Sequence, residues 1–298
     1  MNRPFLGVLP ALLLAGAATL GTGAAPAAAA PAAPSSAPAA AQQRAAAAPR
    51  QATATAVDFA GTVALNNCSG SLVRPPGAAD GDPALVLSNG HCLESGFLGP
   101  GEVVVGRSST RSFTLLNRSG GSAGTVRATK VAYATMTDTD VSLYQLGSTY
   151  AQIRQRYGIA ALPLSADHPV QGTAISVVSG YWKRIYSCAV DGFAYRLKEG
   201  DWTWKDAVRY TAACDTIGGT SGSPVLDPAT GKVVAVNNTR NEDGERCTLN
   251  NPCEVDESGQ VTVRPGIAYA EETYGIVPCL APGNLVDLTR PGCALPRP

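Results

Sequence analysis

Ser221 lies in the segment DTIGGTSGSPVLD, residues 215–227, with glycines close to it on both sides. A serine hydroxyl is a weak nucleophile until a base removes its proton, and the oxyanion formed by its attack needs backbone N–H groups directed at it. Gly218 and Gly219 permit the tight turn that aims successive N–H groups at one point. The segment therefore predicts a nucleophilic serine, the alternative from glycine content alone being a Gly-rich hairpin loop.

His91 and Asp140 are the candidates for the base and for the group that orients it. His91 follows the apolar run ALVLS and directly precedes a cysteine, and its ordinary pKa near neutrality suits a general base. Asp140 stands directly before the strand-like run VSLYQL, where a carboxylate can accept from an imidazole N–H and fix its tautomer. Asp138 is an alternative to Asp140. Taken singly, each residue also fits an ordinary loop or turn position.

The order of these residues excludes one other class of hydrolase. An α/β-hydrolase requires Gly-x-Ser-x-Gly with its histidine last in the chain. Here Ser223 replaces the second glycine, and no histidine follows Ser221. His168, the only other histidine, lies in a loop-like segment with no cysteine or strand to fix it, so we expect no catalytic role for it.

The elements that must position these residues are predicted to be β-strands. From residue 57 onward, short β-type runs such as GTVAL, SGSLV, EVVVG, SFTLL, AISVVSGYW and GKVVAVNN alternate with segments rich in Gly, Asn, Asp and Pro. This spacing is typical of an antiparallel sandwich or barrel. Only YAQIRQRYG, residues 150–158, has a helical pattern. The fold class is therefore all-β.

The N-terminal region predicts export. A basic residue, an apolar stretch and small residues in Ala-x-Ala order indicate a signal peptide over residues 1–30. Residues 31–56 are mostly Ala, Pro, Ser and Gln, a composition that predicts a disordered propeptide or linker, and residues 57–298 form the folded domain. The net charge of zero and pI near 6.7 give no reason to expect nucleic acid as a partner, and no later segment is apolar enough for stable membrane association. We expect a secreted, extracellular protein.

The eight cysteines predict four disulfides, because an even number in an exported chain is typical of an oxidised framework. A zinc site is disfavoured, since no Cys-x-x-Cys pair occurs and the chain has two histidines. We expect neither a metal nor a cofactor. The cysteines are Cys68, Cys92, Cys188, Cys214, Cys247, Cys253, Cys279 and Cys293.

The segments NGHC, DVSLY and GTSGSP, in this order along the chain, resemble the A-A-H-C, D-I-A-L-L and G-D-S-G-G-P segments of the chymotrypsin-like (trypsin-fold) serine peptidases. The resemblance extends over residues 57 to about 280. It implies two six-stranded antiparallel β-barrels with the active site between them. It also implies His91 as general base, Asp140 as orienting carboxylate, Ser221 as nucleophile, and the N–H groups of Gly219 and Ser221 as oxyanion hole.

Two departures from the digestive members of this family concern maturation. Those members have an aspartate directly before the nucleophile that pairs with a freed N-terminus, whereas Thr220 stands here and no Ile-Val-Gly-Gly start lies near Val57. The motif T-x-G-G-x-S-G-S-P-V instead resembles the bacterial branch that includes the glutamyl endopeptidases, which lose a propeptide without forming that pair. We therefore expect a zymogen whose propeptide lies within residues 31–56.

The expected substrate-binding residues are Asp215, Gly218 and Asn237. Asp215 stands six residues before the nucleophile, where a trypsin-type enzyme keeps the carboxylate that binds Arg or Lys. An aspartate at this place also appears in the glutamyl endopeptidase branch, where a histidine on the following strand recognises glutamate; the matching strand here offers Asn237. A preference for Arg or Lys is favoured, because a buried Asp215 is costly without a cationic substrate or an internal partner.

Position within a barrel of this kind suggests how the cysteines pair, although eight cysteines allow 105 connectivities. The pairs expected are Cys68–Cys92, Cys188–Cys214, Cys247–Cys253 and Cys279–Cys293. The segment that follows Cys279 is too rich in Pro and Gly for the terminal helix usual in the family.

The sequence thus predicts a monomeric serine endopeptidase acting on proteins or peptides. Two alternatives stay open: a catalytically inactive binding protein on the same fold, and an esterase that uses the same three residues.

Overall fold

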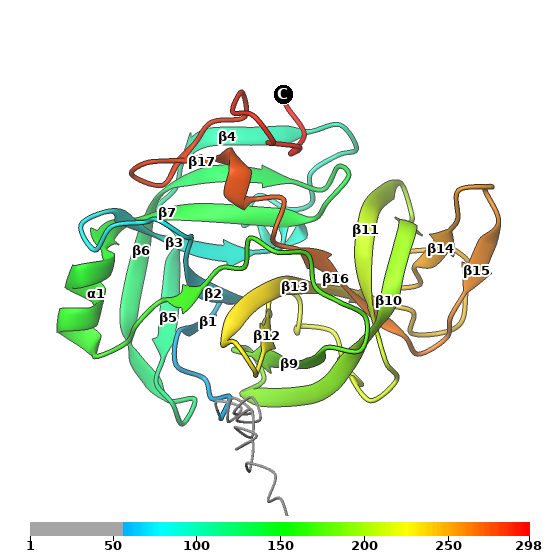
Figure 1. Ribbon diagram of the computed structural model, residues 1–298, viewed down its shortest axis with the longest axis horizontal. Coiled ribbons are helices and arrows are strands. Elements are labelled where there is room, and N and C mark those ends of the chain that lie inside the picture. The colour runs from blue at the N-terminus through cyan, green and yellow to red at the C-terminus, as the bar shows by residue number, and fades with distance from the viewer. Residues whose placement is uncertain (1–55) are drawn as a thin grey trace, which may run out of the picture. The chain divides into compact units, whose positions relative to one another are not determined.

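The computed structural model describes residues 56–298. The expected signal peptide and all but the last residue of the expected propeptide lie outside this range. The regular secondary structure of the described chain is almost entirely β-strand (Figure 1). No helix within residues 56–298 is long and apolar enough to cross a membrane.

Six antiparallel strands close into a first barrel. Their order around the barrel is β1-β5-β6-β7-β3-β2, and pairing between β1 and β2 completes the ring. A short strand, β4 (Val103–Ser108), pairs with β6, and β8 (Leu162–Pro163) adds a parallel contact to β2. The barrel strands are β1 (Thr62–Ala64), β2 (Ser69–Arg74), β3 (Pro83–Ser88), β5 (Ser112–Leu116), β6 (Ser122–Thr135) and β7 (Val141–Thr149).

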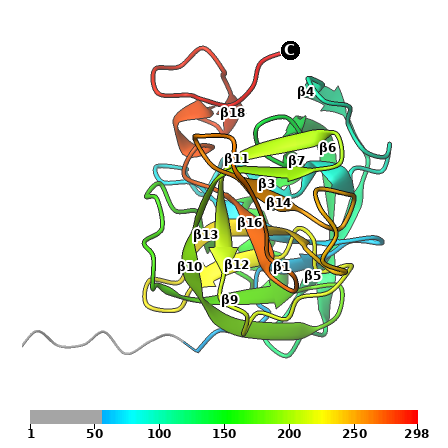
Figure 2. The same cartoon turned by 90° about the vertical axis from the view of Figure 1, so that its right-hand side faces the viewer.

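A second ring of six antiparallel strands follows in the order β11-β16-β13-β12-β9-β10, closed by pairing between β10 and β11. A hairpin of β14 (Cys253–Val255) and β15 (Val261–Val263) extends it beyond β10 (Figure 1). Figure 2 shows β9, β10, β12 and β13 of this ring from the side. The ring strands are β9 (Ala174–Ser179), β10 (Arg184–Glu199), β11 (Trp202–Tyr210), β12 (Pro224–Asp227), β13 (Lys232–Arg240) and β16 (Ala268–Glu272). The predicted fold, two six-stranded barrels, is confirmed.

The single α-helix of the described residues, α1 (Tyr150–Tyr157), lies where the helical pattern predicted it. Its ends follow from local chemistry. The Thr149 side chain accepts from Gln152 N and the Gln152 side chain accepts from Thr149 N, which forms a capping box. Gly158 ends the helix with a φ of +68°.

Apolar side chains fill each barrel and also the contact between them. The first barrel buries residues such as Leu72, Phe113 and Tyr144, and the second buries others such as Val177 and Val208. A third apolar cluster combines residues of both barrels, among them Leu85, Leu143, Val178, Val233 and Ile276. The barrels are therefore packed against each other through a water-excluding surface, which fixes the segments that meet there.

Four disulfides brace this arrangement, and they join the pairs expected from position, Cys68–Cys92, Cys188–Cys214, Cys247–Cys253 and Cys279–Cys293. The C-terminal segment forms a short 3-10 helix, η2 (Val277–Cys279), and a two-stranded hairpin of β17 (Leu280–Ala281) and β18 (Leu285–Val286) in place of an α-helix.

Candidate active site

His91 sits in a 3-10 turn, η1 (Gly90–Cys92), directly after β3. The Cys68–Cys92 disulfide ties this turn to the residue before β2. Gly90 is required by close packing, since a Cβ atom there would overlap the Thr135 carbonyl oxygen. Because glycine has no side chain, the His91 turn can pack directly against Thr135 at the end of β6.

Asp140 holds the imidazole from behind. Its side chain is fully buried; Oδ2 lies 2.7 Å from His91 Nδ1, and Oδ1 accepts from the His91 backbone N–H at 3.0 Å. These two contacts fix the ring with Nδ1 protonated, so that Nε2 carries the lone pair. Asp138 has a different role: it adopts a φ of +61° and pairs with Lys205 near the surface.

The charges around His91 favour its protonated form. Burial, the largest single influence, lowers the pKa of His91, but the charge and hydrogen bond of Asp140 outweigh it and hold this pKa above the ordinary value of 6.5. Glu199 and Glu271 add smaller effects in the same direction.

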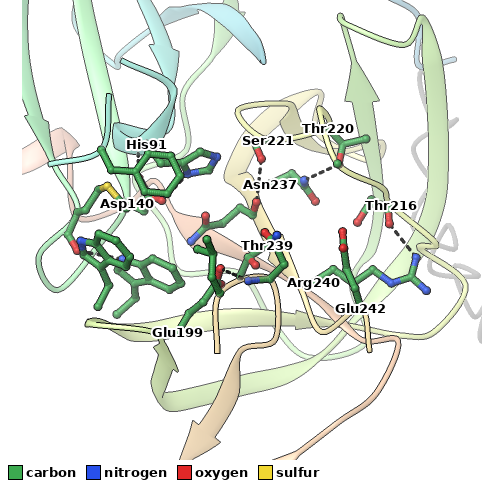
Figure 3. Close-up of a pocket in the computed structure, with 18 of the residues that line it drawn as sticks. His91, Asp140, Glu199, Thr216, Thr220, Ser221, Asn237, Thr239, Arg240 and Glu242 are labelled. Atoms are coloured by element: carbon green, nitrogen blue, oxygen red, sulfur yellow. Dashed lines mark hydrogen bonds and ion pairs between the residues drawn. The ribbon is translucent and has the colours of Figure 1, made fainter. Parts of the chain in front are cut away.

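Ser221 lies in a loop whose backbone matches the expected turn. Thr220 N donates to Ile217 O at 3.0 Å, closing a turn in which Gly219 has a φ of +86°, as the third residue of a type II turn requires. Within residues 56–298, the N–H groups of Gly219 and Ser221 donate to no protein acceptor. The Ser221 hydroxyl donates to the Asn238 carbonyl at 3.1 Å, and it has no hydrogen bond to His91 (Figure 3).

Gly222 lets the Ser221 loop approach the first barrel. Its φ is +78°, and a Cβ atom there would overlap the Ser69 carbonyl oxygen. The Ser221 carbonyl accepts from Ser69 N at 2.8 Å. The loop is thus joined by its backbone to the strand that follows the Cys68–Cys92 disulfide.

Asn89 connects all three segments, and the sequence analysis did not identify it. The side chain is fully buried. Its Nδ2 donates to the Asp140 carbonyl at 2.7 Å, and its Oδ1 accepts from Gly222 N at 2.5 Å. Because Asn89 also lies two residues before His91, one amide sets the relative positions of the three candidate residues.

Two buried carboxyl groups near Asp140 were also missed. Glu271 accepts from Asp140 N at 3.2 Å and from the Asn238 side chain at 2.8 Å. Burial, reinforced by the charge of Asp140, raises the pKa of Glu271 to about 8. Burial likewise raises the pKa of Glu199, whose Oε1 accepts from Asn250 N. Their positions depend on strand pairings far apart in the chain, which no local pattern reveals.

His91, Asp140 and Ser221 line one cavity. Gly218 and Asn237, two of the expected substrate-binding residues, line it as well. Asn237 Nδ2 donates to Thr220 Oγ1 at 3.1 Å, which anchors the residue before Ser221. Phe97 covers the imidazole edge, with ring centroids 5.6 Å apart.

Asp215, expected to bind substrate from a buried position, does not line this cavity and is not buried. Its side chain is 68% exposed and pairs with Arg240 from β13. Arg240 itself lines the cavity, donates from Nη1 to the Thr216 carbonyl at 2.8 Å (Figure 3), and has a buried Nε without a hydrogen-bond partner. Arg240 is therefore the internal partner of Asp215.

The fold and this cavity define the class of protein. Residues 68–236, more than half of the chain, match the family model described as trypsin-like peptidase domain. The chain belongs to this family, which acts on peptide or protein substrates. A search of curated proteins finds no match.

Solved structures with a similar fold include several proteases. The MamO protease domain from Magnetospirillum magneticum has 16% identity and a TM-score of 0.46, over 75% of this chain and 97% of that one. A protease from M. tuberculosis in its active form has 13% identity and a TM-score of 0.44, over 80% and 82%. A thermostable serine protease, AL20, from an extremophilic microorganism has 16% identity and a TM-score of 0.41, over 72% and 91%.

Proposed function

We propose that this protein is a secreted serine endopeptidase that hydrolyses peptide bonds through an acyl-enzyme. The observation that carries this proposal is the His91 imidazole, held by Asp140 in the cavity that also contains Ser221. The loop of Ser221 presents two unpartnered N–H groups, as an oxyanion hole requires. The trypsin-like family supplies the reaction class.

In the proposed reaction, His91 Nε2 takes the proton of Ser221 as Oγ attacks the carbonyl carbon of the substrate. The N–H groups of Gly219 and Ser221 bind the oxyanion, and His91 then gives its proton to the leaving amine. Asp140 stabilises the imidazolium throughout. Water, activated by His91, releases the acyl group. For the first step, the Ser221 side chain exchanges its bond to the Asn238 carbonyl for one to His91, a change that substrate binding commonly completes.

The proposed maturation removes residues 1–30 as a signal peptide and a propeptide within residues 31–56, as in the glutamyl endopeptidase branch. Thr220 supports a route without a buried ion pair. Its Oγ1 donates to Ile217 O at 2.6 Å and accepts from Asn237, so the place of the family's aspartate is filled by neutral hydrogen bonds. N-terminal sequencing of the secreted protein tests this: we expect a start near Val57, and a start near Ala30 would contradict it.

The residue before the scissile bond is proposed to meet Arg240 rather than Asp215. A preference for Arg or Lys loses its basis, because Asp215 is exposed and already paired. Arg240 lines the cavity, so an acidic side chain would gain a charge-assisted hydrogen bond to its guanidinium. Buried Glu199 lies in the same cavity with a raised pKa, which reduces its opposing charge.

The test is hydrolysis of a peptide library and of matched esters by the secreted, processed protein. We expect internal peptide bonds to be cleaved, and Ser221→Ala and His91→Ala to lose nearly all activity while keeping the circular dichroism spectrum of the parent. Cleavage of esters alone would indicate the esterase alternative. Turnover of neither substrate by folded protein would favour the inactive binding protein.

A further inference from the structure

A second group of polar side chains converges outside the active-site cavity. His168 lies in the segment before β9, Asp206 lies in β11 and Glu272 ends β16. His168 Nε2 is 3.1 Å from Asp206 Oδ2 and 3.0 Å from Glu272 Oε1, and one ligand atom from each residue lies within 4.8 Å of the other two. None of the three lines the cavity of His91 and Ser221.

The surroundings of His168 fix both its orientation and its tautomer. Its ring packs against Phe193 and Tyr274, with centroid distances of 4.5 and 5.1 Å. Nδ1 lies 2.6 Å from the Pro169 carbonyl oxygen, which can only accept, so Nδ1 carries a proton. In the neutral ring, Nε2 is then a lone pair that faces two carboxylate oxygens. Three acceptors at this separation need a proton or a cation between them.

Glu272 provides an independent indication of a missing partner. Its side chain is only 6% exposed, and neither carboxylate oxygen has a hydrogen-bond partner of suitable geometry. A buried carboxylate without such partners is costly unless another positive group satisfies it. The unsatisfied Oε1 of Glu272 lies 3.0 Å from His168 Nε2, so a single positive group between them would satisfy both atoms.

The Asp206 carboxylate is also held close to His168 Nε2. The Tyr274 hydroxyl donates to its Oδ2 at 3.0 Å. Its backbone has a φ of +55° within β11, a conformation that costs free energy. The other charged group beside it, Lys205, is paired with Asp138 and does not neutralise the cluster.

We propose that His168, Asp206 and Glu272 form a binding site for a divalent cation of the zinc type. One imidazole nitrogen and two carboxylate oxygens suit zinc, whereas calcium and magnesium prefer oxygen ligands alone. Ligand atoms bound at about 2.0–2.2 Å to one ion lie roughly 3–3.5 Å apart, which matches the separations from Nε2. The Pro169 carbonyl that accepts from Nδ1 is the outer partner that zinc-binding histidines commonly have. Partial exposure of His168 and Asp206 leaves room for water to complete the coordination.

The cation would stabilise the wall behind Asp140. Lys205, the neighbour of Asp206, donates its backbone N–H to the Asp138 carbonyl at 2.8 Å. Glu271, the neighbour of Glu272, accepts from Asp140 N. A bound ion would therefore join the segment of His168 to β11 and β16, the two strands that contact the Asp138–Asp140 loop. This role is structural and separate from the proposed hydrolysis.

The test is isothermal titration of the full secreted protein with zinc chloride at neutral pH, after removal of metals with a chelator. Ser221→Ala serves as the parent, because it cannot digest itself. We expect one zinc ion per chain and a zinc-dependent rise in the unfolding temperature. Asp206→Asn and His168→Gln should each weaken binding by more than about tenfold and remove that rise.

Two control variants distinguish zinc bound by this cluster from zinc bound elsewhere on the chain. Asp191→Asn changes an exposed carboxylate on neighbouring β10 and should bind zinc as the parent does. His91→Ala, made in the same parent, should also bind normally; loss of zinc there would place the ion at the active site and overturn the proposal.

Absence of zinc binding by the folded parent, unchanged binding in Asp206→Asn, or equally tight calcium binding would also overturn it. A proton shared between His168 and the two carboxylates would then satisfy the cluster. Asp206 and His168 are partly exposed, so these variants are expected to fold; near-ultraviolet circular dichroism checks this, and a folded result from either one is sufficient.

Discussion

Replacement of Asn89 by alanine is expected to reduce both stability and catalysis. The Asn89 side chain joins the Asp140 carbonyl to the Gly222 N–H, at 2.7 and 2.5 Å, in a region without solvent. Alanine removes both bonds and leaves the buried Asp140 carbonyl unpaired, whereas Gly222 N keeps its second bond, to the Asn237 carbonyl at 2.9 Å. An unsatisfied buried group costs about 1–3 kcal/mol, so the variant should lose about 1–3 kcal/mol of unfolding free energy.

The catalytic effect follows from the segments that Asn89 joins. One bond holds the residue that orients His91, and the other holds the residue after Ser221. Their loss should lower kcat more than it raises KM, because Asn89 does not line the cavity. A displacement of catalytic groups by about 1 Å lowers rates by about 100-fold, which sets the scale expected.

The assay combines urea unfolding in the Ser221→Ala background with peptide hydrolysis in the active background. Asn284→Ala is the matched control. Asn284 is also buried and donates to the Pro83 carbonyl and the Tyr150 hydroxyl, and none of these three residues lines the cavity. Its φ of +57° makes alanine strained there, so its stability loss should be at least comparable. Equal kcat per folded molecule in the two variants would refute the positioning role of Asn89.

Four further predictions concern the candidate site. The raised pKa of His91 means that kcat/KM should fall as the pH drops through a value above 6.5, since only neutral His91 accepts a proton; a pH–rate profile with its acid limb below 6.5 contradicts this. The same shift makes the stability contribution of His91 present below pH 6.5 and lost as the pH rises through its folded-state pKa, which urea unfolding across that range measures. Arg240→Ala should release Asp215 and move the ratio of kcat/KM from Glu-containing towards Arg-containing substrates by about tenfold or more; an unchanged ratio places specificity elsewhere. Gly222→Ala should lower the unfolding free energy by at least about 1–3 kcal/mol, because the φ of Gly222 is +78° and a Cβ atom there would overlap the Ser69 carbonyl oxygen. Gly218→Ala is the control: no atom lies close to a Cβ at that position, so the unfolding midpoint should change little.

Much of the fold follows from local sequence pattern. The apolar runs before His91 and after Asp140 form β3 and β7, and the pattern of residues 150–158 forms α1. The strands β10 and β11 were not among the predicted runs. Their burial alternates irregularly, and polar residues such as Asp191 and Asp206 interrupt them, because this ribbon carries ion pairs as well as core contacts.

The candidate site was predictable only where a local motif encodes it. His91 and Ser221 each stand in a short motif of turn-forming residues, so a shared place in one cavity could be inferred from the sequence. The pairing of Asp215 with Arg240 could not, because it depends on how the end of β13 meets the segment before the Ser221 loop. Glu271 was likewise hidden, since its contact with Asp140 spans the two barrels.

The same limit applies to His168. Its sequence context gave neither a strand nor a cysteine to fix it, and a role for it was discounted. In the folded chain it is held instead by two aromatic rings and a backbone carbonyl from segments that the pattern did not connect. Side chains of this kind are recognised only when the tertiary contacts are known.

The most direct test of the proposed catalytic site is the intact mass of the secreted protein before and after treatment with an organofluorophosphate. Such a reagent reacts with a serine whose proton is removed by an adjacent base and whose developing charge is met by an oxyanion hole. We predict one adduct per chain, located at Ser221 by peptide mapping and absent from Ser221→Ala and His91→Ala. Folded, processed protein that forms no adduct, or forms one at another serine, would contradict the assignment of Ser221 as the nucleophile.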